Sequence, residues 1–150
     1  MLQDLVTPAQ YWHDPFNQTA FLAGSHYLAD INNEREQKNS SYSAGAVNNK
    51  LFISFSFDPS ALTRLDMLVL AQWQQDTTII PAASSQFGFY SLGQDNVVTP
   101  LRESELYTQD WLGLKQLDSE GKLHFPSMQG DHMDFDWEWF TENIVIPYLI

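Results

Sequence analysis

Near its carboxyl end the chain reads Met128-Gln129-Gly130-Asp131-His132-Met133-Asp134-Phe135-Asp136-Trp137-Glu138-Trp139-Phe140. Gly130 favours a tight turn, because glycine adopts turn conformations at little steric cost. Asp134 or Asp136 is placed to cap a closing helix over residues 136–149, whose acidic first turn suits the positive end of the helix dipole. A strand–loop–helix enzyme carries its general base on such a loop. His132 is therefore a candidate base, and a surface histidine that only decorates a turn is the alternative.

A second informative stretch is Met67-Leu68-Val69-Leu70-Ala71-Gln72-Trp73. Its continuous apolar character predicts a strand that is covered on both faces, as in the parallel sheets of α/β proteins. Asp76 follows directly, and open α/β sheets place their chemistry just beyond the carboxyl ends of their strands. The alternative, and the more frequent case, is a turn aspartate that accepts hydrogen bonds from its own backbone.

The remaining elements are read from hydrophobic spacing. Residues 106–117 carry apolar side chains close to helical spacing, and Leu123-His124-Phe125-Pro126 predicts a short strand that is stopped by its proline. Residues 51–57 alternate apolar side chains with serine, which predicts a half-buried strand. Residues 87–93 form an aromatic pad that is either core packing beneath a loop or a groove for an apolar ligand.

Composition limits the possible functions. The chain has 150 residues, 43% of them hydrophobic and 14% aromatic, which is enough for one domain with a hydrophobic core. A net charge of −12 and only seven Lys and Arg residues argue against nucleic-acid binding and against adsorption on anionic membranes.

Cysteine is absent, which excludes disulfides, thiolate metal sites and a cysteine nucleophile within these residues. The four histidines have no paired spacing, so we expect no metal site and no cofactor. No apolar run is long enough to span a bilayer, and the first residues show no signal-peptide pattern. Asn17 and Asn39 begin two glycosylation sequons, which slightly favour an extracytoplasmic protein.

The order of strand, Asp76 loop, helical segments, strand, His132 loop and final helix is that of the last third of an α/β hydrolase, in which the acid precedes the histidine. Several short stretches then resemble the palmitoyl-protein thioesterases, and the lysosomal type-1 form in particular. The matching text is Tyr11-Trp12-His13-Asp14-Pro15, Leu28-Ala29-Asp30-Ile31-Asn32 with Glu34-Arg35, Phe87-Gly88-Phe89-Tyr90, Leu106-Tyr107-Thr108-Gln109-Asp110, Leu112-Gly113-Leu114-Lys115, Gly130-Asp131-His132 and Glu138-Trp139-Phe140.

This resemblance implies the C-terminal part of an α/β hydrolase, with an incomplete parallel sheet and flanking helices, plus the end of an inserted lid domain. Residues 1–61 correspond to the lid and residues 62–150 to the core. The implied activity removes fatty acyl groups from S-acylated cysteines of proteins or peptides in the lysosome, or after secretion. Asp76 matches the acid of the catalytic triad and His132 its histidine. Beside them, Ile79, Ile80, Phe87 and Phe89 are candidates for contacts with the acyl chain, and structural packing is the alternative for each.

Two departures from the family pattern stand out. No serine lies in Gly-x-Ser-x-Gly, and Ser91, with Gly93 after it, has Phe89 where the first glycine belongs. In the family the nucleophile lies N-terminal to Tyr11-Trp12, so we expect this chain alone to have little or no thioesterase activity. Residues 45–61 have no counterpart in the family, and we interpret them as an atypical insert, with translated intron as the hypothesis for its origin. The alternative function is that of a non-catalytic pseudoenzyme remnant that binds acyl chains or partner proteins.

Overall fold

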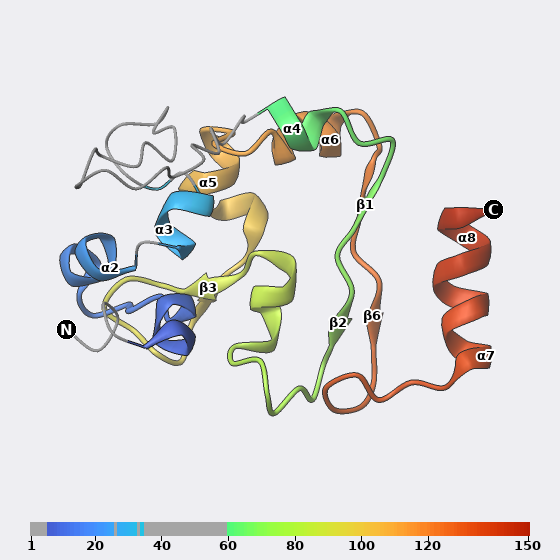
Figure 1. Cartoon of the computed structure of the whole chain (residues 1–150), viewed down its shortest axis with the longest axis horizontal. Helices are drawn as coiled ribbons and strands as arrows, with labels where there is room; N and C mark the ends of the chain where they lie inside the picture. Colours follow the sequence, from blue (N-terminus) through green and yellow to red (C-terminus); the bar gives the residue numbers. More distant parts are fainter. Residues whose placement is uncertain (1–5, 26, 33, 35–59) are drawn as a thin grey trace, which may run out of the picture.

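The computed structural model describes residues 6–25, 27–32, 34 and 60–150 (Figure 1). The strand expected over residues 51–57, residues 45–59 of the insert and the sequon at Asn39 lie outside the described residues.

Two strand segments lie side by side through the centre of the molecule (Figure 1). The first consists of β1 (Leu68–Val69) and β2 (Gln72–Trp73), and the second of β5 (Leu123–His124) and β6 (Ser127–Met128). The two segments are parallel, with Leu68 opposite Leu123 and Trp73 opposite Met128. One ladder of N–H donors joins them, running from Leu68, Leu70, Gln72 and Gln74 to the carbonyls of Lys122, His124, Pro126 and Met128. The strand predicted over residues 67–73 is therefore confirmed.

The short strand predicted over residues 123–126 is present as β5, which ends at His124, just before the proline. In this register the Leu70 carbonyl would accept the N–H of residue 126, which proline lacks. The side chain of Gln86 replaces that donor, because its Nε2 lies 2.9 Å from the Leu70 carbonyl oxygen and 3.2 Å from that of Pro126. The ladder is interrupted at the proline and resumes in β6.

The expectation that this strand is covered on both faces holds in part: elements of the chain lie on both sides of it, but residues 68–73 are all only half-buried. On one side lies the closing helical run, formed by α7 (Trp137–Phe140), the π-helical turn η4 (Thr141–Val145) and α8 (Ile146–Leu149). It reaches the strands through ring contacts, such as Tyr148 against His124 with centroids 4.9 Å apart. The predicted helix over residues 136–149 is confirmed, and Asp136 caps it by accepting the Trp139 N–H at 2.7 Å.

The hydrophobic core lies on the other side of the strands. It is formed by the buried leucines Leu101, Leu106, Leu112, Leu114, Leu117 and Leu123. These come largely from η3 (Leu101–Glu103), α5 (Glu105–Thr108) and α6 (Leu114–Ser119). The helical spacing over residues 106–117 therefore belongs to two short helices, because Asp110 (φ 54°) and Gly113 (φ 80°) both take the left-handed conformation between them.

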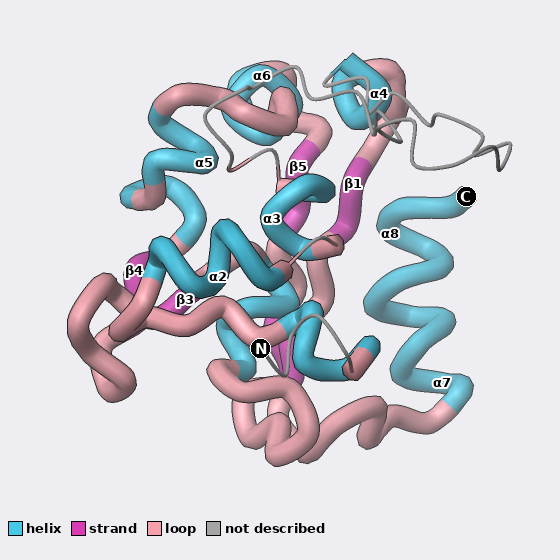
Figure 2. Tube along the Cα trace, turned by 60° about the vertical axis from the view of Figure 1, so that its left-hand side comes forward, coloured by secondary structure: helices cyan, strands magenta, loops and turns pink. Residues whose placement is uncertain are grey.

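The remaining elements surround this core. An antiparallel pair, β3 (Phe89–Tyr90) and β4 (Val98–Thr99), follows η2 (Ala82–Gln86). Towards the amino end lie η1 (Thr7–Tyr11), α2 (Gln18–Gly24) and α3 (Leu28–Ile31), and α4 (Ser60–Thr63) precedes β1. Figures 1 and 2 place α2 and α3 on the opposite side of the strands from α8. Small parallel and antiparallel sheets flanked by helices agree with the expected α/β class. Within the described ranges, every helix is too short or too polar to traverse a bilayer.

Candidate active site

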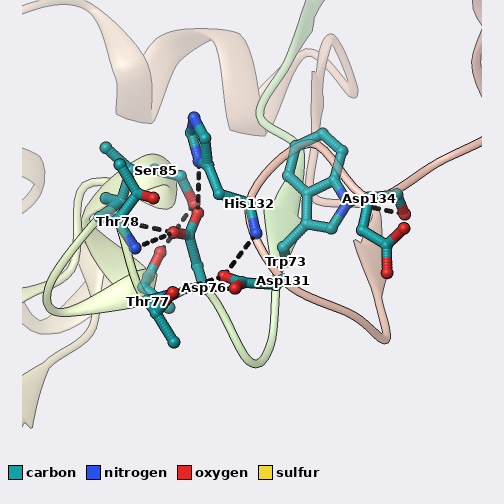
Figure 3. Close-up of polar contacts among 10 residues, drawn as sticks. Trp73, Asp76, Thr77, Thr78, Ser85, Asp131, His132 and Asp134 are labelled. Atoms are coloured by element: carbon teal, nitrogen blue, oxygen red, sulfur yellow. Dashed lines mark hydrogen bonds and ion pairs between the residues drawn. The ribbon is translucent and has the colours of Figure 1, made fainter.

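Two loops meet where the parallel strands end (Figure 3). Asp76 lies just beyond β2 and His132 just beyond β6. The strand ladder continues into these loops, because the Gln75 N–H donates to the Gly130 carbonyl at 3.1 Å. Parallel strands bring their carboxyl ends to one edge, so residues far apart in the sequence are held together there.

The imidazole of His132 faces the carboxylate of Asp76 (Figure 3). The distance from His132 Nδ1 to Asp76 Oδ2 is 2.8 Å, a normal length for a hydrogen bond to a carboxylate. The Asp76 side chain is 4% exposed, whereas that of His132 is 38% exposed. The contact expected between these two residues is confirmed, and their catalytic roles remain a prediction.

The Asp76 carboxylate also accepts hydrogen bonds from its own loop. Its Oδ1 lies 2.8 Å from the Thr78 nitrogen and 2.7 Å from the Ile79 nitrogen. The turn interpretation of Asp76 is therefore correct, and it accompanies the contact with His132. Burial raises the pKa of this carboxyl, but the Ile79 N–H, the His132 imidazole and the Thr78 N–H outweigh that effect and hold the pKa below its usual value. Asp76 is thus kept ionised and in a fixed orientation.

A second carboxylate, that of Asp131, ties the two loops together. Its Oδ1 accepts the Thr77 N–H at 2.7 Å and the His132 N–H at 2.7 Å, and the Thr77 hydroxyl donates to both of its oxygens. These donors, the Thr77 N–H first among them, lower the pKa of Asp131. The sequence interpretation assigned no role to Asp131 or Thr77. The available signal was the position of Asp131 directly before the candidate base.

An aromatic group borders the imidazole. The rings of Trp73 and His132 have centroids 6.5 Å apart, and Phe135 lies 5.7 Å from Trp73. The Trp73 indole N–H donates to the Asp134 carbonyl at 3.3 Å, which fixes the ring beside the loop (Figure 3). Asp134, the other candidate helix cap, thus helps to shape the loop.

The four candidates for acyl contacts lie in different surroundings. Ile79 is half-buried and Ile80 is 63% exposed, and both follow Asp76 in its loop. Phe87 packs against the leucine core, and Phe89 stacks on His13 with centroids 5.2 Å apart. An acyl-binding role for these residues remains a prediction.

Within the described residues, no serine hydroxyl is hydrogen-bonded to His132. Ser91, the serine closest to the family motif, hydrogen-bonds Thr99 in the hairpin at 2.7 Å. No group of three potential metal ligands occurs in the described part of the chain. The arrangement suits the orientation and protonation of an imidazole, as in the triads of serine hydrolases.

Comparisons with known proteins agree with this chemistry. A family model described as palmitoyl protein thioesterase matches residues 1–132. Palmitoyl-protein thioesterase 1 of Caenorhabditis elegans is 34% identical over 149 residues, which cover 99% of this chain and 44% of that protein. Palmitoyl-protein thioesterase 3 of Dictyostelium discoideum is 36% identical over 153 residues, which cover 99% and 47% respectively. The human lysosomal thioesterase PPT2 is 34% identical over 113 residues, which cover 75% of this chain and 32% of that protein. The chain spans less than half the length of these relatives.

Proposed function

The chain belongs to the palmitoyl protein thioesterase family, and we propose that it carries the acid and the base of a hydrolase acting on fatty-acyl thioesters. Its membership confirms the family resemblance found in the sequence. One observation carries the proposal beyond the family: the hydrogen bond of 2.8 Å between His132 Nδ1 and an Asp76 carboxylate that is almost fully buried.

In this proposal the two ring nitrogens of His132 have different tasks. An ionised carboxylate only accepts hydrogen bonds, so the proton of a neutral His132 resides on Nδ1. Nε2 then presents its lone pair, and within the described residues no polar group occupies it. A nucleophile that approaches Nε2 transfers its proton there, and Asp76 stabilises the imidazolium that results.

The reaction would follow the serine-hydrolase sequence. A serine Oγ attacks the thioester carbonyl while His132 accepts its proton and then returns it to the departing cysteine thiolate. Water activated by the same histidine next hydrolyses the acyl-serine, which releases the fatty acid. Because Gly-x-Ser-x-Gly does not occur in these 150 residues, the proposal requires a serine from outside them.

The family also suggests the setting. We place residues 1–61 in a lid over the acyl groove and residues 62–150 in the hydrolase core. The substrates would be S-palmitoylated proteins or peptides, and the compartment the lysosome, with glycosylation at Asn17 or Asn39. Asn17 is exposed, and its Oδ1 caps α2 by accepting the Ala20 N–H at 2.9 Å, which leaves the amide nitrogen available to a glycan.

The test begins with the coding sequence upstream of Met1. We expect it to encode Gly-x-Ser-x-Gly, and a genuine start at Met1 in a folded, expressed protein would favour the non-catalytic remnant instead.

The natural protein that contains these residues should then hydrolyse a palmitoyl thioester. His132→Gln should reduce kcat about 10³- to 10⁶-fold, as in other triads. His124→Gln is the matched control, because His124 contacts Tyr148 and not Asp76. Equal losses in the two variants would contradict the assignment of His132.

A further inference from the structure

A pocket of about 260 Å³ lies between the amino-terminal segment and the β3–β4 hairpin. The amino-terminal segment contributes His13, Gln18 and Glu34, and Phe89 and Trp111 are among the residues that close the other side. Asp76 and His132 are not part of its lining, so a ligand bound in this pocket is separate from the proposed catalytic function.

Two polar atoms of this pocket lack partners. His13 Nδ1 and Gln18 Oε1 are both buried, and neither has a hydrogen-bond partner among the described residues. Buried polar atoms in folded proteins are nearly always paired, because removing them from water without a partner is unfavourable. Two such atoms in the lining of one pocket point to a group that binds between them.

The protonation of His13 follows from its neighbours. Its Nε2 lies 3.3 Å from Glu34 Oε2, and Asn32 donates to the other oxygen of Glu34 at 2.8 Å. Because the carboxylate accepts only, Nε2 carries the proton and Nδ1 of the neutral ring is an acceptor. The ring is fixed between Phe21 and Phe89, with centroids 4.3 and 5.2 Å away. The residues that line this pocket thus leave two acceptors unpaired, His13 Nδ1 and Gln18 Oε1, which suit a ligand with at least two N–H donors.

The charge of the pocket selects among such ligands. Its titratable lining residues are His13, Glu34, Tyr90, Glu103 and Glu105, and neither Lys nor Arg lines it. The aromatic rings of the lining favour an organic cation, which binds well against ring faces. We propose that this pocket binds a primary alkylammonium group, with the ammonium hydrogen-bonded to His13 Nδ1 and Gln18 Oε1.

Isothermal titration calorimetry on the full chain tests the site. Nα-acetyl-lysine methylamide should bind at least tenfold more tightly than its neutral counterpart, in which Nε is also acetylated. Gln18→Leu should weaken the lysine probe about 10- to 100-fold, as expected for a lost hydrogen bond to a charged group. Gln116→Leu is the matched control, since Gln116 lies on the exposed surface of α6 and bonds Glu120. Equal binding of both lysine derivatives, or unchanged affinity in Gln18→Leu, would overturn the proposal.

Thermal unfolding separates binding from a structural role. Gln18→Leu removes an unpaired buried acceptor, so its unfolding midpoint should equal or exceed that of the original chain. A lower midpoint would indicate that Gln18 supports the fold, and would count against the site.

A third probe, n-pentylammonium, identifies the source of the cation. Binding as tight as that of the lysine probe assigns the pocket to free amines, and much weaker binding assigns it to a lysine side chain within a peptide. If none of the probes binds, the pocket holds ordered water only and the proposal fails.

Discussion

Replacement of Asp76 by asparagine should invert the tautomer of His132. The Thr78 and Ile79 N–H groups both donate to Oδ1, at 2.8 and 2.7 Å, so the side-chain oxygen of an asparagine must remain at that position. Its NH₂ group is then forced towards His132 Nδ1, at the place where Asp76 Oδ2 now lies 2.8 Å away. A donor at that place turns Nδ1 into an acceptor and moves the ring proton to Nε2, where it blocks proton transfer from a nucleophile. In a serine protease the corresponding change reduces kcat about 10⁴-fold, and we expect a loss of this order.

The tautomer can be measured without catalysis. Long-range ¹H–¹⁵N correlation spectra of the neutral imidazole should place the proton on Nδ1 in the original chain and on Nε2 in Asp76→Asn. Asp66→Asn is the control, because Asp66 is exposed and precedes the strand. Retention of the Nδ1 proton in Asp76→Asn, or a fall in kcat of less than tenfold in the natural enzyme, would refute the role given to Asp76.

Three further outcomes are expected. Acidification should loosen the two loops, because they are joined by the ionised Asp131 carboxylate. The pKa of Asp131 in the folded chain lies below its ordinary value of 3.8. Its contribution to the stability of the folded state is therefore complete above 3.8 and is lost as the pH falls through the lower folded pKa. The Thr77 amide proton should report this as an NMR titration with a midpoint below 3.8, and an unchanged curve in Asp131→Asn would contradict the contact. Leu117→Ala should lower the free energy of unfolding by about 2–5 kcal/mol in urea, because Leu117 is fully buried. The control Leu92→Ala, at a side chain 65% exposed, should change it by no more than about 0.5 kcal/mol, and equal losses would place the core elsewhere. Asp136→Ala should destabilise the closing helix by roughly 1 kcal/mol, visible as lower helicity in circular dichroism, and unaltered helicity would argue against the cap.

The contact between Asp76 and His132 was predictable because it depends on topology. Asp76 closely follows one predicted strand and His132 lies on the loop after the next, and parallel strands end at the same edge of a sheet. The cap at Asp136 was predictable too, although Asp134 matched the pattern equally well. Only the structure distinguishes them, because the carboxylate that accepts the Trp139 N–H is that of Asp136.

Other features were beyond the reach of sequence patterns. The apolar spacing over residues 106–117 could not show that this segment forms two helices. The left-handed conformation of Asp110, which separates them, does not change the spacing of the apolar residues. Pro126 marks the end of a strand by local rules, and the compensation by Gln86 comes from forty residues away in the sequence. The hydrogen bonds of Asp131 to Thr77 and the unpaired atoms of His13 and Gln18 likewise depend on distances between residues, which the sequence alone does not give.

The ladder of hydrogen bonds between the strands fixes the positions of Asp76 and His132 along the two chains. Its last rung within the strands joins the Gln74 N–H to the Met128 carbonyl, and Asp76 and His132 lie two and four residues beyond it. Both arms are turns whose length is fixed by contacts such as that of the Gln75 N–H with the Gly130 carbonyl, so loss or gain of a single residue on either arm would move the carboxylate or the imidazole away from its partner. Natural variation in length should therefore be rare on these two arms. It should be confined to exposed turns elsewhere, such as residues 92–97 of the hairpin.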